Sequence, residues 1–168
     1  MYQMLDHTDI SILKILQENA RLTNQEIAEK LHKTASPIHR RIKRLEDDGF
    51  IKRYVAVLDP QKIDRGLMAF THVQLKDHSK DSLSLFEQAI IRLPEVLECY
   101  HMTGMYDFIL KVAVKDLAAY HEFLMHELFG IMAIGSVQTT LVMKQSKHEG
   151  AFPITIPQQP FPSAHKTD

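Results

Sequence analysis

A short stretch near the N-terminus, KTASPIHRRIKRLE at residues 33–46, constrains the fold of this chain more than any other. Ile38, Ile42 and Leu45 recur at i, i+4 and i+7, which places them on one stripe of an α-helix. Basic side chains occupy the other side, and Thr34 is a suitable N-cap residue. A helix with one apolar face, one cationic face and short polar residues at its start has the properties needed to enter the major groove of DNA.

A lone basic helix is more often an ordinary solvated surface, so the neighbouring elements decide between these two interpretations. Apolar residues at helical spacing over residues 12–16 predict a first helix, with Thr8 or Asp9 as its N-cap. Thr23, followed three residues later by Glu26, is a capping-box signature and predicts the start of a second helix. Three short helices with brief connections, the last one basic, indicate a helix-turn-helix domain.

The run after the basic helix, Phe50–Leu58, is rich in β-branched and aromatic residues and predicts a strand. A strand in this position gives a winged helix-turn-helix. Within the basic helix, Arg41 lies beside the apolar stripe, where it either braces the fold or reaches a phosphate. The side chains predicted to face bases are Ser36, His39, Arg40 and Lys43, and those predicted to hold phosphates are Arg44 and Lys52 or Arg53. The full predicted DNA-binding set is Thr34, Ser36, His39, Arg40, Arg41, Lys43, Arg44, Lys52 and Arg53.

The second half of the chain has a different pattern. Residues 59–66 begin with Asp-Pro and end at a glycine, which predicts a linker between domains at 1–58 and 67–147. After the linker, strand-like and helix-like segments follow in the order β-α-β-β-α-β, the ferredoxin-like sandwich. The predicted fold class is therefore α+β. The sheet face away from the helices is half apolar, so we expect a partner to cover part of it.

The turn TGMYD at residues 103–107 joins two predicted strands and has the features of a small-molecule site. Gly104 can adopt φ > 0 and lets a ligand approach the backbone closely. Free backbone N–H groups can hold a carboxylate, while Asp107 or another nearby carboxylate can pair with an ammonium group. Together these groups match an amino acid, and Met105 favours an apolar one such as leucine or methionine. The predicted effector-binding residues are Thr103, Gly104, Met105, Tyr106, Asp107, Thr139 and Thr140, with the two threonines on opposite faces of the last strand.

The net charge of −1 is low for a DNA-binding protein, but the charge is unevenly distributed. Residues 1–58 carry a net charge of +2 and residues 59–168 a net charge of −3. The single cysteine, Cys99, excludes an internal disulfide and fits the reducing cytoplasm. No signal peptide or membrane helix is expected. The spacing of the histidines predicts no metal site, and no cofactor is expected. Residues 148–168, which are rich in proline, predict an extended or loose tail.

Two long stretches resemble the Lrp/AsnC family of leucine-responsive and asparagine-responsive, or feast/famine, transcription regulators. The first is LDHTDISILKILQENARLTNQEIAEKLHKTASPIHRRIKRLEDDGFIKRYVAVLDP, residues 5–60. The second is ECYHMTGMYDFILKVAVKDLAAYHEFL at 98–124, continued by VQTTLVMK at 137–144. The Arg-Ile-Lys-Arg-Leu segment, the Gly-x-x-Asp turn and the order of the domains carry the resemblance.

The resemblance implies a winged helix-turn-helix domain joined to a ligand-sensing domain. It further implies that sensing domains pair sheet to sheet into dimers, and that dimers often close into octamers. Effectors, usually amino acids, would sit between dimers near the Gly-x-x-Asp turn. The expected partners are double-stranded DNA, other copies of the chain and an amino acid.

Two alternatives remain open at this point. One is a catalytic relative on the same scaffold, similar to the sirohaem decarboxylases, although the sequence shows no nucleophile-base pair and enzyme activity is not expected. The other is an architectural DNA-binding protein without an effector. Visible absorbance from a bound tetrapyrrole would favour the enzyme, while amino-acid binding would separate a sensor from an architectural protein.

Overall fold

The computed structural model describes residues 5–131, 134–147 and 150–155. Contacts divide the chain into two compact units. Residues 1–56 and 147–168 form the first, which we call the helical unit, and residues 57–146 form the second, the sheet unit.

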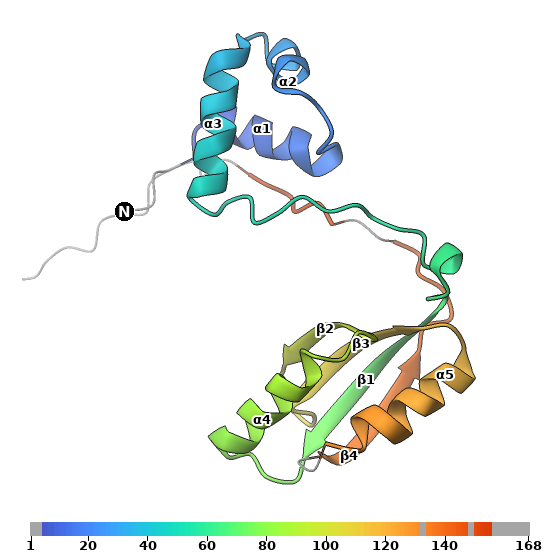
Figure 1. Ribbon diagram of the computed structural model, residues 1–168. Coiled ribbons are helices and arrows are strands. Elements are labelled where there is room, and N and C mark those ends of the chain that lie inside the picture. Colours follow the sequence, from blue (N-terminus) through green and yellow to red (C-terminus); the bar gives the residue numbers. More distant parts are fainter. Residues whose placement is uncertain (1–4, 132–133, 148–149, 156–168) are drawn as a thin grey trace, which may run out of the picture. The chain divides into compact units, whose positions relative to one another are not determined.

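The helical unit is built from three helices, as predicted, and Figure 1 shows α3 packed across α1 and α2. Thr23 and Glu26 form the expected capping box at the start of α2. The N-cap of α1 is Asp6, not Thr8 or Asp9, because Asp6 accepts a hydrogen bond from the backbone of Asp9 and Asp9 reciprocates. The three helices are α1 (His7–Glu18), α2 (Asn24–Lys30) and α3 (Ala35–Asp47).

A small apolar core joins the three helices. The stripe predicted from spacing is buried, since Ile38, Ile42 and Leu45 all face inward. Burying apolar side chains is the main driving force for packing these short helices, which would be marginal alone. The remaining buried members of this core are Ile12, Leu13, Ile27 and Ala28.

The predicted strand at Phe50–Leu58 is wrong for the single chain. The segment forms no strand, and Val55, Val57 and Leu58 are exposed. A strand needs a neighbour to complete its hydrogen-bond ladder, and the described part of the helical unit contains no other strand. The segment is held by Ile51, whose backbone N–H donates to Leu45 and whose side chain packs against the core, and by the hydroxyl of Tyr54, which donates to Glu46.

The sheet unit has the predicted β-α-β-β-α-β order, and its four antiparallel strands lie in the order β2-β3-β1-β4. Both helical segments cover the same face of the sheet (Figure 1). The predicted linker contains the 3-10 helix η1 (Pro60–Ile63). The other elements are β1 (Leu67–Leu75), α4 (Lys80–Ile90), β2 (Val96–His101), β3 (Phe108–Val114), α5 (Leu117–Glu122), its π-helical continuation η2 (Phe123–Leu128) and β4 (Ile134–Leu141).

Strand β3 supplies the centre of the sheet core. Phe108, Leu110, Val112 and Val114 alternate toward the helices and are buried, as the period of two predicts. Phe108 packs on Phe86 of α4, with ring centroids 4.6 Å apart. Among the described residues of the sheet unit, no helix covers the opposite sheet face, and the predicted effector turn lies just before β3.

The segment 150–155 returns to the helical unit. The side chain of Gln17 on α1 holds the backbone of Phe152 in both directions, accepting from its N–H at 2.6 Å and donating to its carbonyl at 3.2 Å. Ile154 packs against the helical core. The described part of the predicted loose tail is thus extended but attached, while residues 148–149 and 156–168 lie outside the described residues.

Candidate DNA interface and effector site

The outer face of α3 is the candidate DNA-reading surface. Ser36, Arg40 and Lys43 project from the side opposite the buried stripe and are exposed. His39 is also exposed, but its Nδ1 lies 3.1 Å from the amide nitrogen of Asn24 on α2. This contact connects the reading face to the start of the preceding helix. The arrangement offers two cations, a hydroxyl and an imidazole along one helix face, which are groups that bind phosphates and base edges.

Other predicted DNA-binding residues lie around this face. Thr34 is the N-cap residue of α3 by backbone conformation, but its side chain makes no capping hydrogen bond. Lys52 and Arg53 are exposed on the extended segment that follows α3. The structure therefore brings Thr34 to the start of the reading helix and places the other two just beyond its end.

Arg41 and Arg44 form a separate group beside the reading face. Nη1 of Arg41 lies 2.7 Å from Asp9 and 2.6 Å from Asp6, and Nη2 of Arg44 lies 2.5 Å from Asp9. The hydrogen bonds that Arg41 donates to Asp9 and then to Asp6 raise the pKa of Arg41 above its usual value. Burial pushes the pKa of Asp6 upward, but the Asp9 backbone N–H and Arg41 outweigh it and lower that pKa. Of its two predicted roles, Arg41 thus has the bracing contact, and Arg44 is paired with a carboxylate.

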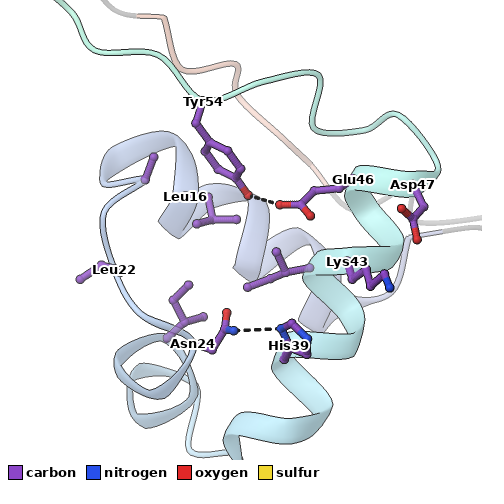
Figure 2. A pocket seen from close by; sticks show the side chains of 11 residues that line it. Leu16, Leu22, Asn24, His39, Lys43, Glu46, Asp47 and Tyr54 are labelled. Carbon is purple, nitrogen blue, oxygen red and sulfur yellow. Dashed lines mark hydrogen bonds between the residues drawn. The ribbon is translucent and has the colours of Figure 1, made fainter.

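A groove of about 540 Å³ lies on the other flank of α3, and Figure 2 shows it in close view. The phenol of Tyr54 closes one end and donates to Glu46 Oε1 at 2.8 Å, while Asn24 and His39 meet at the other end. Burial, followed by the contact with Glu46, raises the pKa of Tyr54 to about 12. The groove is lined by Leu16, Ala20, Leu22, Asn24, Ile27, His39, Ile42, Lys43, Glu46, Asp47 and Tyr54.

The turn 103–107, predicted to bind an effector, is open to solvent in the described structure. Gly104 has φ 118°, as its predicted role requires, and a Cβ there would meet nothing within 4 Å. Met105 is 76% exposed. Within the described residues, the backbone N–H groups at positions 103–106 donate to no protein acceptor. The turn therefore presents several free donors to an anionic group, such as a carboxylate.

Both carboxylate oxygens of Asp107 contact other groups of the sheet unit. Its Oδ2 accepts a hydrogen bond from the backbone N–H of Leu75 at 2.8 Å, where the pairing of β1 with β4 shifts register. Its Oδ1 lies 3.4 Å from Nε2 of the exposed His78. The carboxylate thus supports the strand junction next to the turn through Oδ2, while its Oδ1 lies near His78.

The two predicted threonines of β4 have different surroundings. Thr139 lies on the helix side, where its hydroxyl is 2.8 Å from the Tyr120 hydroxyl. The Tyr120 hydroxyl is also 2.7 Å from the hydroxyl of Thr71, so the three side chains form a hydrogen-bonded chain within the sheet unit. Thr140 pairs with Phe70 of β1 and lies on the open face of the sheet. Of the two threonines, only Thr140 has its side chain on the open face of the sheet.

Sequence reasoning named Tyr106 in the turn but missed its two polar neighbours, His72 and Gln138. The hydroxyl of Tyr106 bonds to the side chain of Gln138 on β4, and its ring centroid lies 5.2 Å from that of His72 on β1. Nδ1 of His72 is buried without a hydrogen-bond partner among the described residues. His72 of β1 and Gln138 of β4 are directly opposite each other in the sheet. Predicting that they meet requires the register between the two strands, which the sequence pattern does not give.

Two further structural features bear on the class of protein. Within the described ranges, no three His, Cys, Asp or Glu side chains gather as a metal site. None of the described helices combines the length and apolar character needed to cross a bilayer.

The fold and the two candidate sites define a DNA-binding regulator with a separate ligand-binding domain. Residues 5–52 match the winged helix-turn-helix DNA-binding family model, and residues 68–152 match the Lrp/AsnC ligand binding domain model. The chain belongs to the Lrp/AsnC family of transcription regulators.

Similar proteins agree with this assignment. The chain is 36% identical to the DNA-binding transcriptional activator DecR of Escherichia coli (strain K12) over 151 residues, which cover 90% of this chain and 99% of DecR. It is 35% identical to the Bkd operon transcriptional regulator of Pseudomonas aeruginosa, covering 89% and 98% of the two chains. A transcriptional regulator from Neisseria meningitidis, solved as a complex with L-Met, superposes with a TM-score of 0.85 at 38% identity, covering 89% of this chain and 97% of that chain.

These relatives are transcription regulators, and the chain is a regulator rather than an enzyme. The catalytic alternative is therefore rejected. The α+β fold class, with a helix-turn-helix domain and a ferredoxin-like domain, is confirmed.

Proposed function

We propose that this regulator reads its operator with the outer face of α3 and responds to an apolar amino acid bound at the turn 103–107. The observation that carries the DNA assignment is the set of four exposed groups on that face: Ser36, His39, Arg40 and Lys43. Lys52 and Arg53, beyond the end of the helix, supply phosphate contacts. Residues 59–66 connect this DNA-binding function to the sensing function, and the protein works in the cytoplasm.

Substitution on the outer face tests the DNA assignment. Arg40→Ala removes a cation with no described protein partner, so stability stays unchanged while operator affinity falls. Loss of a bidentate base contact costs roughly 1–3 kcal/mol of discrimination. Fluorescence anisotropy with a selected duplex measures this, and Lys14→Ala, an exposed lysine on α1, is the matched control. Full operator affinity in folded Arg40→Ala and Lys43→Ala proteins would rule out this face.

The effector proposal rests on the free donors of the turn. The N–H groups at positions 103–106 would bind the carboxylate of an amino acid, and Met105 would contact its side chain. Oδ1 of Asp107, which accepts no backbone hydrogen bond among the described residues, or another nearby carboxylate would pair with the ammonium group. The complex of the Neisseria meningitidis relative with L-Met supports an amino acid of this type. Thr140, on the open face, is the threonine we retain for this site.

Isothermal titration calorimetry of the full chain with L-methionine and L-leucine, and with L-aspartate as a charged comparison, tests the effector. Met105→Ala should weaken binding of the apolar amino acids without destabilising the fold, because the side chain is exposed. Met143→Ala is the matched control, since Met143 is a 96% exposed methionine of the same unit. Equal binding by Met105→Ala and the control would exclude Met105 from the site.

We propose that the chain assembles at least into dimers, and by its family resemblance into octamers. The open face of the sheet supports this, because Phe70 and Ile109 lie on it with no covering layer within the described chain. An exposed turn also needs a second surface to enclose a ligand. The effector acts on assembly only if it binds one arrangement more tightly than another. Light scattering that reports a monomer at micromolar concentration would contradict the proposal.

A further inference from the structure

Asp9 is a buried carboxylate that receives donors from three directions. It lies in the first turn of α1 and is 1% exposed. The backbone N–H of Asp6 donates to Oδ2 at 3.1 Å, Arg41 reaches Oδ1 at 2.7 Å, and Arg44 reaches Oδ2 at 2.5 Å. A buried charge without partners is costly, so these contacts are needed for the helical unit to bury this residue at all.

The surrounding charges balance within one small cluster. Arg41 also binds Asp6 at 2.6 Å, so two carboxylates meet two guanidinium groups. Arg41 and Arg44 are three residues apart on α3 and therefore lie on the same flank of that helix. Of the four cations within α3, this cluster neutralises two and leaves Arg40 and Lys43 on the outer face.

The ion pairs of this cluster depend on the orientation of α3, whereas the apolar contacts between α1 and α3 do not. Ile12 and Leu13 of α1 contribute to the apolar core shared with α3, and apolar contacts tolerate rotation of a helix about its axis. Guanidinium groups bind carboxylates through a rigid planar fork. The contacts of Asp9 with two successive turns of α3 therefore fix the rotation of α3, and that rotation decides which side chains reach base edges.

We infer that Asp9 is a positioning residue for DNA recognition, which holds α3 through Arg41 and Arg44 and thereby withholds these two arginines from DNA. This inference rests on the proposed reading face of α3. It adds Asp9, which would not itself contact DNA, to the residues that determine DNA recognition. It assigns a bracing role to Arg44, where the sequence predicted a phosphate contact.

The Asp9→Asn substitution in the full chain tests the positioning role. Asparagine keeps the shape but loses the charge, so both arginines become available to phosphates and the hold on α3 weakens. Two duplexes of equal length serve as probes: one selected by the wild-type protein from a random-sequence pool, and one unselected. We expect affinity for the unselected duplex to be kept or to rise, while the selected-to-unselected affinity ratio falls by about tenfold, the scale of one lost base contact.

Glu18→Gln is the matched control for this substitution. It makes the same charge change on the same helix, and among the described residues the Glu18 side chain has no hydrogen bond or ion pair. Its affinity ratio should equal that of the wild type. A purely structural role for Asp9 would lower affinity for both duplexes together, and an unchanged ratio in Asp9→Asn would overturn the inference.

Salt dependence provides a second test that does not require the Asp9 variant to fold. Lys52→Gln removes a proposed phosphate contact at an exposed lysine, so it should reduce the slope of log K against log salt by about 0.9. Arg44→Gln should leave this slope unchanged and lower the affinity ratio instead. An equal loss of slope in both variants would overturn the positioning role while the proposed function stands. Full operator affinity in folded Lys43→Ala and Arg40→Ala proteins would instead refute the reading face.

Discussion

The two units support their candidate sites in opposite ways. In the helical unit, α3 is held on its inner side by the apolar core and on one flank by Asp9, so its outer face is complete within one chain. In the sheet unit, the turn 103–107 presents free donors from an exposed loop above a rigid sheet. Under the proposed function, the DNA-reading face is preorganised in each copy, whereas the proposed effector site gains its walls only on assembly.

The largest expected effect on stability is at the core of the sheet unit, and it tests whether the two units unfold separately. Phe108 is fully buried at the start of β3, so Phe108→Ala should destabilise the sheet unit by about 3–5 kcal/mol. Because the helical unit has its own core, calorimetry should show one transition shifted far down and the other little changed. Phe129→Ala, at an exposed phenylalanine of the same unit, should shift neither transition by much. Equal shifts of both transitions in Phe108→Ala would show that the units do not unfold separately.

A smaller effect on stability is expected at Asp107, next to the predicted effector turn. Asp107→Ala removes the acceptor for the Leu75 backbone N–H at the register shift, and an unpaired buried donor costs about 1–3 kcal/mol. Hydrogen exchange at the Leu75 amide should accelerate accordingly. Asp107→Asn keeps an oxygen acceptor and should retain most of the protection. Normal protection in Asp107→Ala would mean that this bond does not hold the strand junction.

Asp107 also illustrates which parts of the site the sequence could and could not predict. The turn, its glycine and the order of strands follow from local composition and spacing, and all three are present. The bond from Leu75 depends on a register shift between two strands 60 or so residues apart, which no local pattern encodes. Thr139 was predicted to bind the effector, but its hydrogen bond to Tyr120 could not be predicted, since Tyr120 lies on a helix that packs over the sheet.

The helical unit shows the same limit. The spacing of apolar residues predicted α3 and its buried stripe because period and burial are linked directly. The first helix begins at a different cap, Asp6, which forms a capping box with Asp9; the additional pairing of Asp9 with arginines more than 30 residues away could not be predicted from local spacing. The strand predicted over 50–58 has the right residue types, but strand formation requires a partner as well as propensity.

The contrast between the units can be tested further at the C-terminal segment, which is part of the helical unit. Ile154 is half-buried against the helical core, so Ile154→Ala should destabilise that unit by about 1 kcal/mol, less than for a fully buried isoleucine. Chemical denaturation followed by circular dichroism measures the change. Phe152→Ala is the control, because Phe152 is held through its backbone and its ring is exposed. Identical stabilities for both variants would show that the segment adds no core to the helices.

The smallest effect is expected at Tyr54, the contact that holds the chain leaving α3. Tyr54→Phe removes its hydrogen bond to Glu46 and should destabilise the helical unit by about 1 kcal/mol at neutral pH. The folded pKa of about 12 is above the ordinary value of 10, so the protonated phenol is favoured by folding. Its contribution is fully present below pH 10 and is lost as pH rises through 12. The stability difference between wild type and Tyr54→Phe should therefore shrink across that window. Phenolate absorbance of the wild type minus that of Tyr54→Phe reports the group directly, and a midpoint near 10 would show that Tyr54 is not held by Glu46 in solution.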